Sequence, residues 1–254
     1  MSCFDFRTEV LRSTNSEYRG DTFDCRAEPF RHMKPKPNCL FAKSTMPVYE
    51  IERKFVFNPA LLTRFRMNHG QPPFRCLTHQ RTESFQDEYF DSANKLSKSG
   101  IWIRKRDRSW EAKHRQDGNF LRSSFYETDK VHEIKRLIST HTHLGYNAGP
   151  DANFGLKSIC RYRTTRETFL ADDRFFIMLD LTDFGHWVGE VEIQTHQTAA
   201  ALLDIDIFMQ KYSWFFANRG IPKGKMTAYF ELFGFPSEVC VKHLKGEMIL
   251  TAEG

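Results

Sequence analysis

The sequence predicts a mainly β, α+β fold in which an antiparallel sheet closes into a barrel. The 254 residues contain many short segments with strand character and few with helical character. Several of these segments alternate charged and apolar residues, which is the period of two expected for a strand with two different faces. Because closure removes the exposed edges that invite aggregation, we expect so many short strands to form a barrel.

The elements follow in order along the chain. Alternation predicts a first strand over residues 48–56, and Pro59 suits the first turn of a short helix over residues 59–69 that stops at Gly70. Further helices are expected over residues 130–141 and 197–218. Alternation and intervening turn residues predict the other strands over residues 85–90, 101–106, 109–114, 122–127, 158–168, 175–182, 186–193 and 225–232.

The chain is long enough for one well-buried domain. Its first 46 residues mix acids and bases without an apolar period and end in a proline-bearing segment, and their acid content argues against an organellar transit peptide. We therefore predict a flexible N-terminal extension (1–46), a barrel domain (47–235) and a C-terminal tail (236–254).

Composition limits the classes of partner. No stretch approaches the roughly 20 apolar residues needed to cross a bilayer. The six cysteines are scattered without a C-x-x-C pair, which favours neither a zinc ribbon nor a disulfide scaffold and indicates a reducing, cytoplasmic compartment. The net charge of +5 contains no run of Lys and Arg. We expect a monomer that binds a small anionic molecule, and neither nucleic acid nor membrane.

Charged residues share one face on strands around residues 50–54, 102–106, 111–113 and 190–192. For any single strand, the simplest interpretation is a solvent-facing side of a half-exposed sheet. Repetition on four strands, with both signs mixed, favours charged faces that point into the barrel and apolar faces that lie under the helices. Interior charges cost several kcal/mol each unless they are paired, hydrated or bound to a ligand, so such an interior is a binding site.

The acidic residues suit a hard divalent cation. Glu50 and Glu52 stand two apart on one strand, Glu190 and Glu192 repeat the pair on another, and Asp180 precedes them. Magnesium or manganese prefers such carboxylate oxygens. The basic residues suit phosphate oxygens, since Arg grips them in a bidentate manner and Lys as a point charge. They are Arg104, Arg106, Lys113, Arg166 and Lys225. We expect an acidic wall for metal opposite a basic wall for phosphate.

In the order of its motifs, the sequence resembles the CYTH, or triphosphate tunnel metalloenzyme, superfamily, and most of all its thiamine triphosphatase branch. The motifs are, in order, E-x-E-x-K, Tyr-Phe-Asp, W-x-R-x-R, W-E-x-K, D-x-x-D-F-G and G-E-V-E. The resemblance covers residues 49–232. It implies a closed eight-stranded antiparallel tunnel with flanking helices that hydrolyses a triphosphate with Mg²⁺ or Mn²⁺.

The resemblance also implies a role for each residue. Tyr89 and Lys113 match the pair thought to activate the attacking water in this branch, and a lysine among several cations is expected to have a lowered pKa that suits a base. The metal-side carboxylates would be Glu50, Glu52, Asp180, Glu190 and Glu192, and the phosphate-binding residues Lys54, Arg104, Arg106, Arg166 and Lys225. Thr164 stands where the family commonly has a lysine, which removes one phosphate-binding cation.

Trp102 points to the substrate. It shares strand parity with Arg104 and Arg106, so it should lie on their inner face, where its ring could stack on the thiazolium cation of thiamine. The alternative is that Trp102 only seals the barrel end. Thiamine triphosphate is therefore the leading substrate, with inorganic triphosphate or another triphosphate next, and a non-catalytic polyphosphate- or nucleotide-binding module as the alternative from a different class.

Overall fold

The computed structural model describes residues 48–119, 121–144, 148–217 and 220–236. The predicted N-terminal extension, and all but the first residue of the predicted tail, lie outside these ranges.

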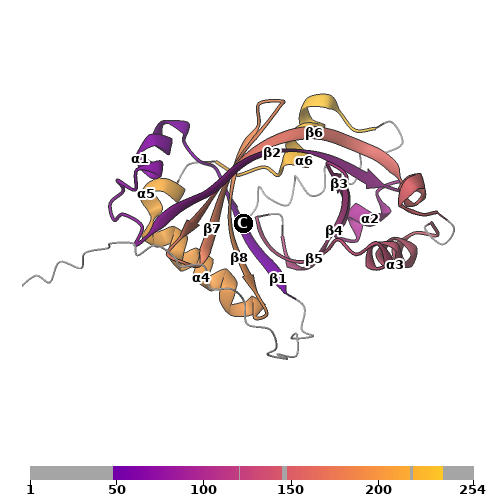
Figure 1. Ribbon diagram of the computed structural model, residues 1–254, viewed down its shortest axis with the longest axis horizontal. Coiled ribbons are helices and arrows are strands. Elements are labelled where there is room, and N and C mark those ends of the chain that lie inside the picture. Colours follow the sequence, from indigo (N-terminus) through magenta and orange to yellow (C-terminus); the bar gives the residue numbers. More distant parts are fainter. Residues whose placement is uncertain (1–47, 120, 145–147, 218–219, 237–254) are drawn as a thin grey trace, which may run out of the picture. The chain divides into compact units, whose positions relative to one another are not determined.

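Eight strands form a closed barrel in the order β1-β5-β4-β3-β2-β6-β7-β8, and each neighbouring pair is antiparallel (Figure 1). This confirms the predicted fold class. The strands are β1 (Tyr49–Phe55), β2 (Leu77–Asp91), β3 (Ile101–Arg106), β4 (Ser109–Gly118), β5 (Arg122–Thr128), β6 (Lys157–Ala171), β7 (Phe175–Thr182) and β8 (Trp187–Thr195).

The helical elements occupy the connections between strands and the C-terminal part of the described chain. The predicted helix over residues 197–218 is divided at Tyr212 into α4 and α5. The elements are η1 (Pro59–Leu61), α1 (Leu62–Arg66), α2 (Lys95–Lys98), α3 (Val131–His141), η2 (Pro150–Gly155), α4 (Thr198–Lys211), α5 (Ser213–Phe216) and α6 (Lys225–Phe233). In the part of the chain that the structure describes, no helix combines the length and the apolar character needed to cross a bilayer.

The prediction of a strand over residues 225–232 was wrong, because these residues form helix α6. Met226, Tyr229, Phe230 and Phe233 recur with the spacing of a helix face, and this period of 3.6 prevails over a short run of alternation. Met226, Tyr229 and Phe230 pack in one cluster with Tyr89 and Tyr162, whose side chains face the barrel interior.

The apolar faces of the strands point outward, as predicted. Ile51 and Phe55 of β1 pack with Phe208 of α4 and Phe215 of α5 in one buried cluster. A Cβ atom on Gly189 would lie 2.3 Å from the Phe55 ring, so only glycine leaves room for this ring against β8. A second cluster joins β3 and β4 to α2 and α3 through Leu96, Ile103, Ala112, Ile134 and Ile138. The side chains between these apolar positions are left to fill the interior.

Candidate functional site

The barrel encloses a cavity of about 440 Å³ whose walls come from the inward faces of β1 to β6 and β8 and from α6. It lies within the size range of small-molecule sites. All but one of the predicted site residues line it, namely Glu50, Glu52, Lys54, Tyr89, Trp102, Arg104, Arg106, Lys113, Arg166, Glu190, Glu192 and Lys225. The exception is Asp180, which lies buried behind the cavity wall.

The acids and bases of the cavity do not form two opposing walls. They alternate in ion pairs, because the antiparallel register of β1 and β8 sets Lys54 opposite Glu190 and Glu52 opposite Glu192. Lys54 pairs with Glu52 and lies 3.3 Å from Glu190. Burial opposes its charge, but these two carboxylates prevail and raise the pKa of Lys54. The predicted separation into a metal wall and a phosphate wall was therefore wrong.

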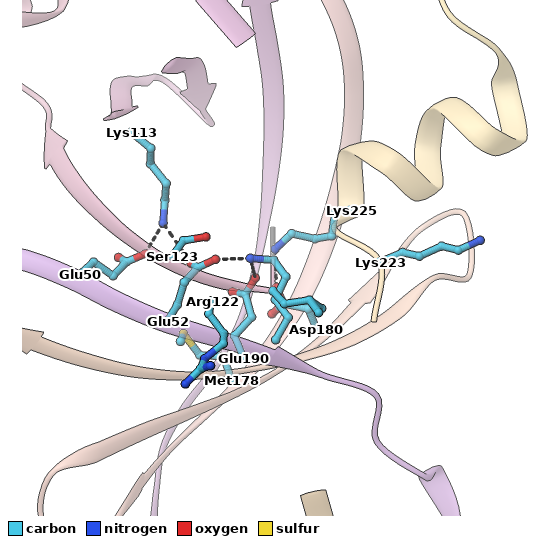
Figure 2. Close-up of polar contacts among 12 residues, drawn as sticks. Glu50, Glu52, Lys113, Arg122, Ser123, Met178, Asp180, Glu190, Lys223 and Lys225 are labelled. Carbon is cyan, nitrogen blue, oxygen red and sulfur yellow. Dashed lines mark hydrogen bonds and ion pairs between the residues drawn. The ribbon is translucent and has the colours of Figure 1, made fainter. Parts of the chain in front are cut away.

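Asp180 is the buried anchor of two cations. Arg166 donates from Nε and Nη2 to its two carboxylate oxygens, both at 2.7 Å, and Nη2 also lies 3.5 Å from Glu190. Lys225, the first residue of helix α6, donates to the same carboxylate (Figure 2). Burial opposes the charge of Asp180, but Arg166 and Lys225 lower its pKa. The lysine predicted on a strand thus reaches the site from a helix.

Two further carboxylates hold the arginines of β3, and sequence reasoning missed both. Arg106 donates from Nε and Nη2 to Asp87, at 2.8 and 2.9 Å, and Arg104 donates from Nε to Glu111 at 2.7 Å. Asp87 is fully buried, and Arg106 and Arg104 lower its pKa against the effect of burial. The signal for Asp87 was its strand parity, since it precedes Tyr89 by two residues and shares its inner face.

Lys113 is held by carboxylates and not by cations. Its ammonium group pairs with Glu50 and lies 4.0 Å from Glu52 (Figure 2). It also pairs with Glu127. Burial opposes the charge, but these carboxylates raise the pKa of Lys113 well above its usual value. The expected lowering of this pKa was wrong, because the β4–β5 register sets Glu127 directly opposite Lys113. In this state Lys113 is a charged ammonium group and not a base.

Tyr89 has a different partner. It lies opposite Arg104 in the β2–β3 register, and Arg104 Nη1 donates to its hydroxyl at 3.4 Å, a long hydrogen bond. Tyr89 and Lys113 line the same cavity, as predicted, but each has its own partner in the structure.

The carboxylates of β1 and β8 match the donors that a divalent cation prefers. Burial, followed by repulsion from Glu50, raises the pKa of Glu192 to about 8, and burial raises the pKa of Glu52. Buried carboxylates with raised pKa values gain most from a cation placed between them. Among the described residues, no three His, Cys, Asp or Glu side chains already form a metal-binding cluster. Glu50, Glu52 and Glu192 thus fit a metal chemically, and holding one requires their side chains to move.

One end of the cavity is aromatic. Trp102 lies on the inner face with Arg104 and Arg106, as its parity predicted, and its ring meets Phe125 edge to face at 5.6 Å. The guanidinium of Arg115 lies 5.4 Å from the centre of the Trp102 ring. Sequence reasoning missed Arg115, although it shares the parity of Lys113. The apolar side chains of this end are Trp102, Phe125, Ile159, Met226, Phe230 and Phe235.

Comparison with known proteins gives one curated relative. The chain is 26% identical over 206 residues to human thiamine-triphosphatase. This alignment covers 72% of the chain and 85% of the relative. No family model matches the chain.

The solved structures that match the chain have low sequence identity to it. A protein from Pyrococcus horikoshii matches 72% of this chain and 99% of its own with a TM-score of 0.49 and 16% identity. A Hippeastrum protein for which a dominant triphosphatase activity is reported matches 72% of this chain and 95% of its own with a TM-score of 0.46 and 15% identity.

The motif order along the sequence, the closed eight-stranded barrel with its charged interior and the relationship to human thiamine-triphosphatase agree with one another. The chain thus resembles the CYTH, or triphosphate tunnel metalloenzyme, superfamily, and it is similar in sequence to human thiamine-triphosphatase.

Proposed function

We propose that this protein hydrolyses a triphosphate compound inside the barrel, with thiamine triphosphate as the leading substrate and thiamine diphosphate and phosphate as products. One observation carries the proposal: a single cavity joins a region of paired Lys, Arg and Glu side chains to a cluster of apolar and aromatic side chains. The charged region suits a triphosphate, and the aromatic cluster suits an organic group attached to it. The curated relative, human thiamine-triphosphatase, supports thiamine as that group.

Binding of a triphosphate proceeds by exchange of ion-pair partners. Arg104, Arg166 and Lys54 line the cavity and each pairs with a carboxylate, so their charges are already desolvated and held in place. Phosphoryl transfer needs positioning and charge neutralisation more than covalent help from the protein. A divalent cation held by Glu50, Glu52 and Glu192 would supply further neutralisation of phosphate oxygens.

Tyr89 and Lys113 remain the proposed residues at the attacking water. Because carboxylates keep Lys113 charged, its ammonium group is suited to stabilise negative charge on the transferred phosphoryl group. The Tyr89 hydroxyl, which already accepts from Arg104, is then the group placed to orient the water. Lys113 is in this proposal an electrostatic residue and Tyr89 a positioning one.

Inorganic triphosphate is the second candidate substrate, and Arg115 favours it. The guanidinium of Arg115 occupies a face of Trp102, the ring on which a thiazolium cation would stack. Inorganic triphosphate places no cation there.

A substrate panel tests the proposal. Thiamine triphosphate, inorganic triphosphate and a nucleoside triphosphate are each incubated with the purified protein and Mg²⁺ or Mn²⁺, and released phosphate is measured. Metal-dependent release from at least one of them is expected, and abolition by EDTA supports the metal. Binding of these compounds without release would instead identify a non-catalytic module.

A further inference from the structure

Arg115 differs from every other cation of the cavity in its partner. The remaining Lys and Arg side chains that line the cavity, in the part of the chain that the structure describes, each pair with a carboxylate; they are Lys54, Arg104, Arg106, Lys113, Arg166 and Lys225. Arg115 has no carboxylate partner among the described residues, and its recorded contact is the face of Trp102. Its charge is therefore uncompensated by the protein.

The backbone fixes where this charge lies. Arg115 lies opposite Gly100 and donates from its backbone nitrogen to the Gly100 carbonyl at 2.8 Å, just before a register shift in the β4–β5 pair. A Cβ atom on Gly100 would lie 3.3 Å from Arg115 Cβ and 3.4 Å from its Nε. The missing side chain at position 100 thus leaves room for Arg115 to extend along the inner face towards Trp102.

Trp102 stands between Arg115 and the phosphate-binding half of the cavity. Gly100 directly precedes β3, and Trp102 and Arg104 follow it on the inner face of that strand. Their neighbours on β4 are, in the same order, Arg115, Lys113 and Glu111. An organic group attached to a triphosphate held at Arg104 would therefore lie at Trp102, within reach of Arg115.

We infer that Arg115 is a specificity-determining residue that weakens the binding of a substrate whose organic group carries a positive charge. This inference rests on the proposed function and adds to it the residue that sets the preference among triphosphates. A cationic ring stacked on Trp102 meets the Arg115 guanidinium as a like charge. A neutral ring, or a triphosphate without an organic group, does not.

The expected size of the effect of Arg115 on affinity follows from Coulomb's law. Two unit charges about 6 Å apart, at effective dielectric constants of roughly 40 to 80, repel with an energy equivalent to about threefold to tenfold in affinity. Arg115→Gln, which keeps a polar but shorter side chain and removes its charge, should raise kcat/KM for thiamine triphosphate relative to inorganic triphosphate by this factor.

The experiment compares both substrates in four proteins. Wild type, Arg115→Gln, Arg115→Lys and Arg108→Gln are assayed at the same metal concentration and ionic strength. Arg108 is exposed in the β3–β4 turn, so its replacement removes the same net charge away from the cavity. The ratio of the two kcat/KM values should change in Arg115→Gln and remain close to wild type in Arg115→Lys and Arg108→Gln. An equal change for both substrates would make Arg115 a general attractor of phosphate and overturn the inference.

A binding measurement separates this inference from the proposed function. Calorimetry compares thiamine diphosphate with its analogue in which a neutral thiophene replaces the thiazolium ring. Arg115→Gln should strengthen binding of the cationic compound by about threefold to tenfold and leave the neutral one unchanged. If wild type hydrolyses no triphosphate, the proposed function fails, and this comparison still decides the inference. Equal effects on both compounds overturn it.

Discussion

Arg106 and Asp87 form a bidentate ion pair between the neighbouring strands β3 and β2, on the inner face of the barrel, with nitrogen–oxygen distances of 2.8 and 2.9 Å. Asp87 is fully buried, and Arg106 also lies 3.9 Å above the ring of Phe85. The pair keeps Arg106 in place beside the side chains that we propose to bind phosphate.

Replacing Asp87 with Asn should destabilise the protein by up to about 3–5 kcal/mol, because it leaves the half-buried Arg106 charge without a counter-charge. The free energy of unfolding from urea denaturation measures this loss. Glu88→Gln is the matched control, since Glu88 is on the same strand with the opposite parity and has no recorded ion pair among the described residues. An Asp87→Asn protein as stable as the control would contradict the structural role of the pair.

The same pair predicts a dependence of stability on acid. The pKa of Asp87 in the folded state is lowered from its usual value near 3.8. The contribution of Asp87 to the free energy of unfolding is therefore fully present above that usual value, and it is lost as pH falls through the lower pKa of the folded state. Below about pH 4 the Tm of the wild type should therefore decrease, and the Tm of Asp87→Asn should decrease less steeply. Thermal melts from pH 7 to pH 2.5 test this; parallel profiles for the two proteins would count against it.

Glu192 predicts the opposite dependence. Burial and repulsion from Glu50 raise the pKa of Glu192 from 4.5 to about 8 in the folded state. The stability that comes from protonated Glu192 is therefore fully present below its pKa in the unfolded chain, and it is lost as pH rises through about 8. Glu192→Gln should then raise the Tm of the metal-free protein at pH 9 and reduce the further stabilisation by added Mg²⁺. Melts at pH 6 and pH 9, with EDTA or with Mg²⁺, separate the two effects. A variant that Mg²⁺ stabilises as strongly as wild type would remove Glu192 from the proposed metal site.

Lys113 tests whether its charge or its basicity matters. Lys113→Ala should lower kcat by roughly 10²-fold or more, the scale of losing one group aimed at developing charge. Lys113→Arg retains a permanent charge and cannot act as a base near neutral pH, so it should recover part of the lost rate. Single-turnover rates with saturating substrate measure both. An arginine variant as slow as the alanine variant would favour proton transfer by Lys113.

The alternation of residues by itself determined most of the barrel and the inner face of its strands. The strands over residues 101–106 and 175–182 match the structure at both ends, and Trp102 and Lys113 lie inside as their parity requires. This follows because the period of a strand is local and fixes which side chains share a face. Residues 225–232 were the exception, since eight residues fit either period, and packing of Met226 and Phe230 selected the helix.

Only the tertiary structure decided which charges meet. The sequence places Arg106 and Asp87, or Lys113 and Glu127, on separate strands, and the register of neighbouring strands brings each pair together. That pairing reverses the direction of the expected pKa shift of Lys113, because the pKa of a buried lysine depends on the sign of its nearest charges. Strand parity therefore identified the inner residues, while register and closure of the barrel determined their charge state and their partners.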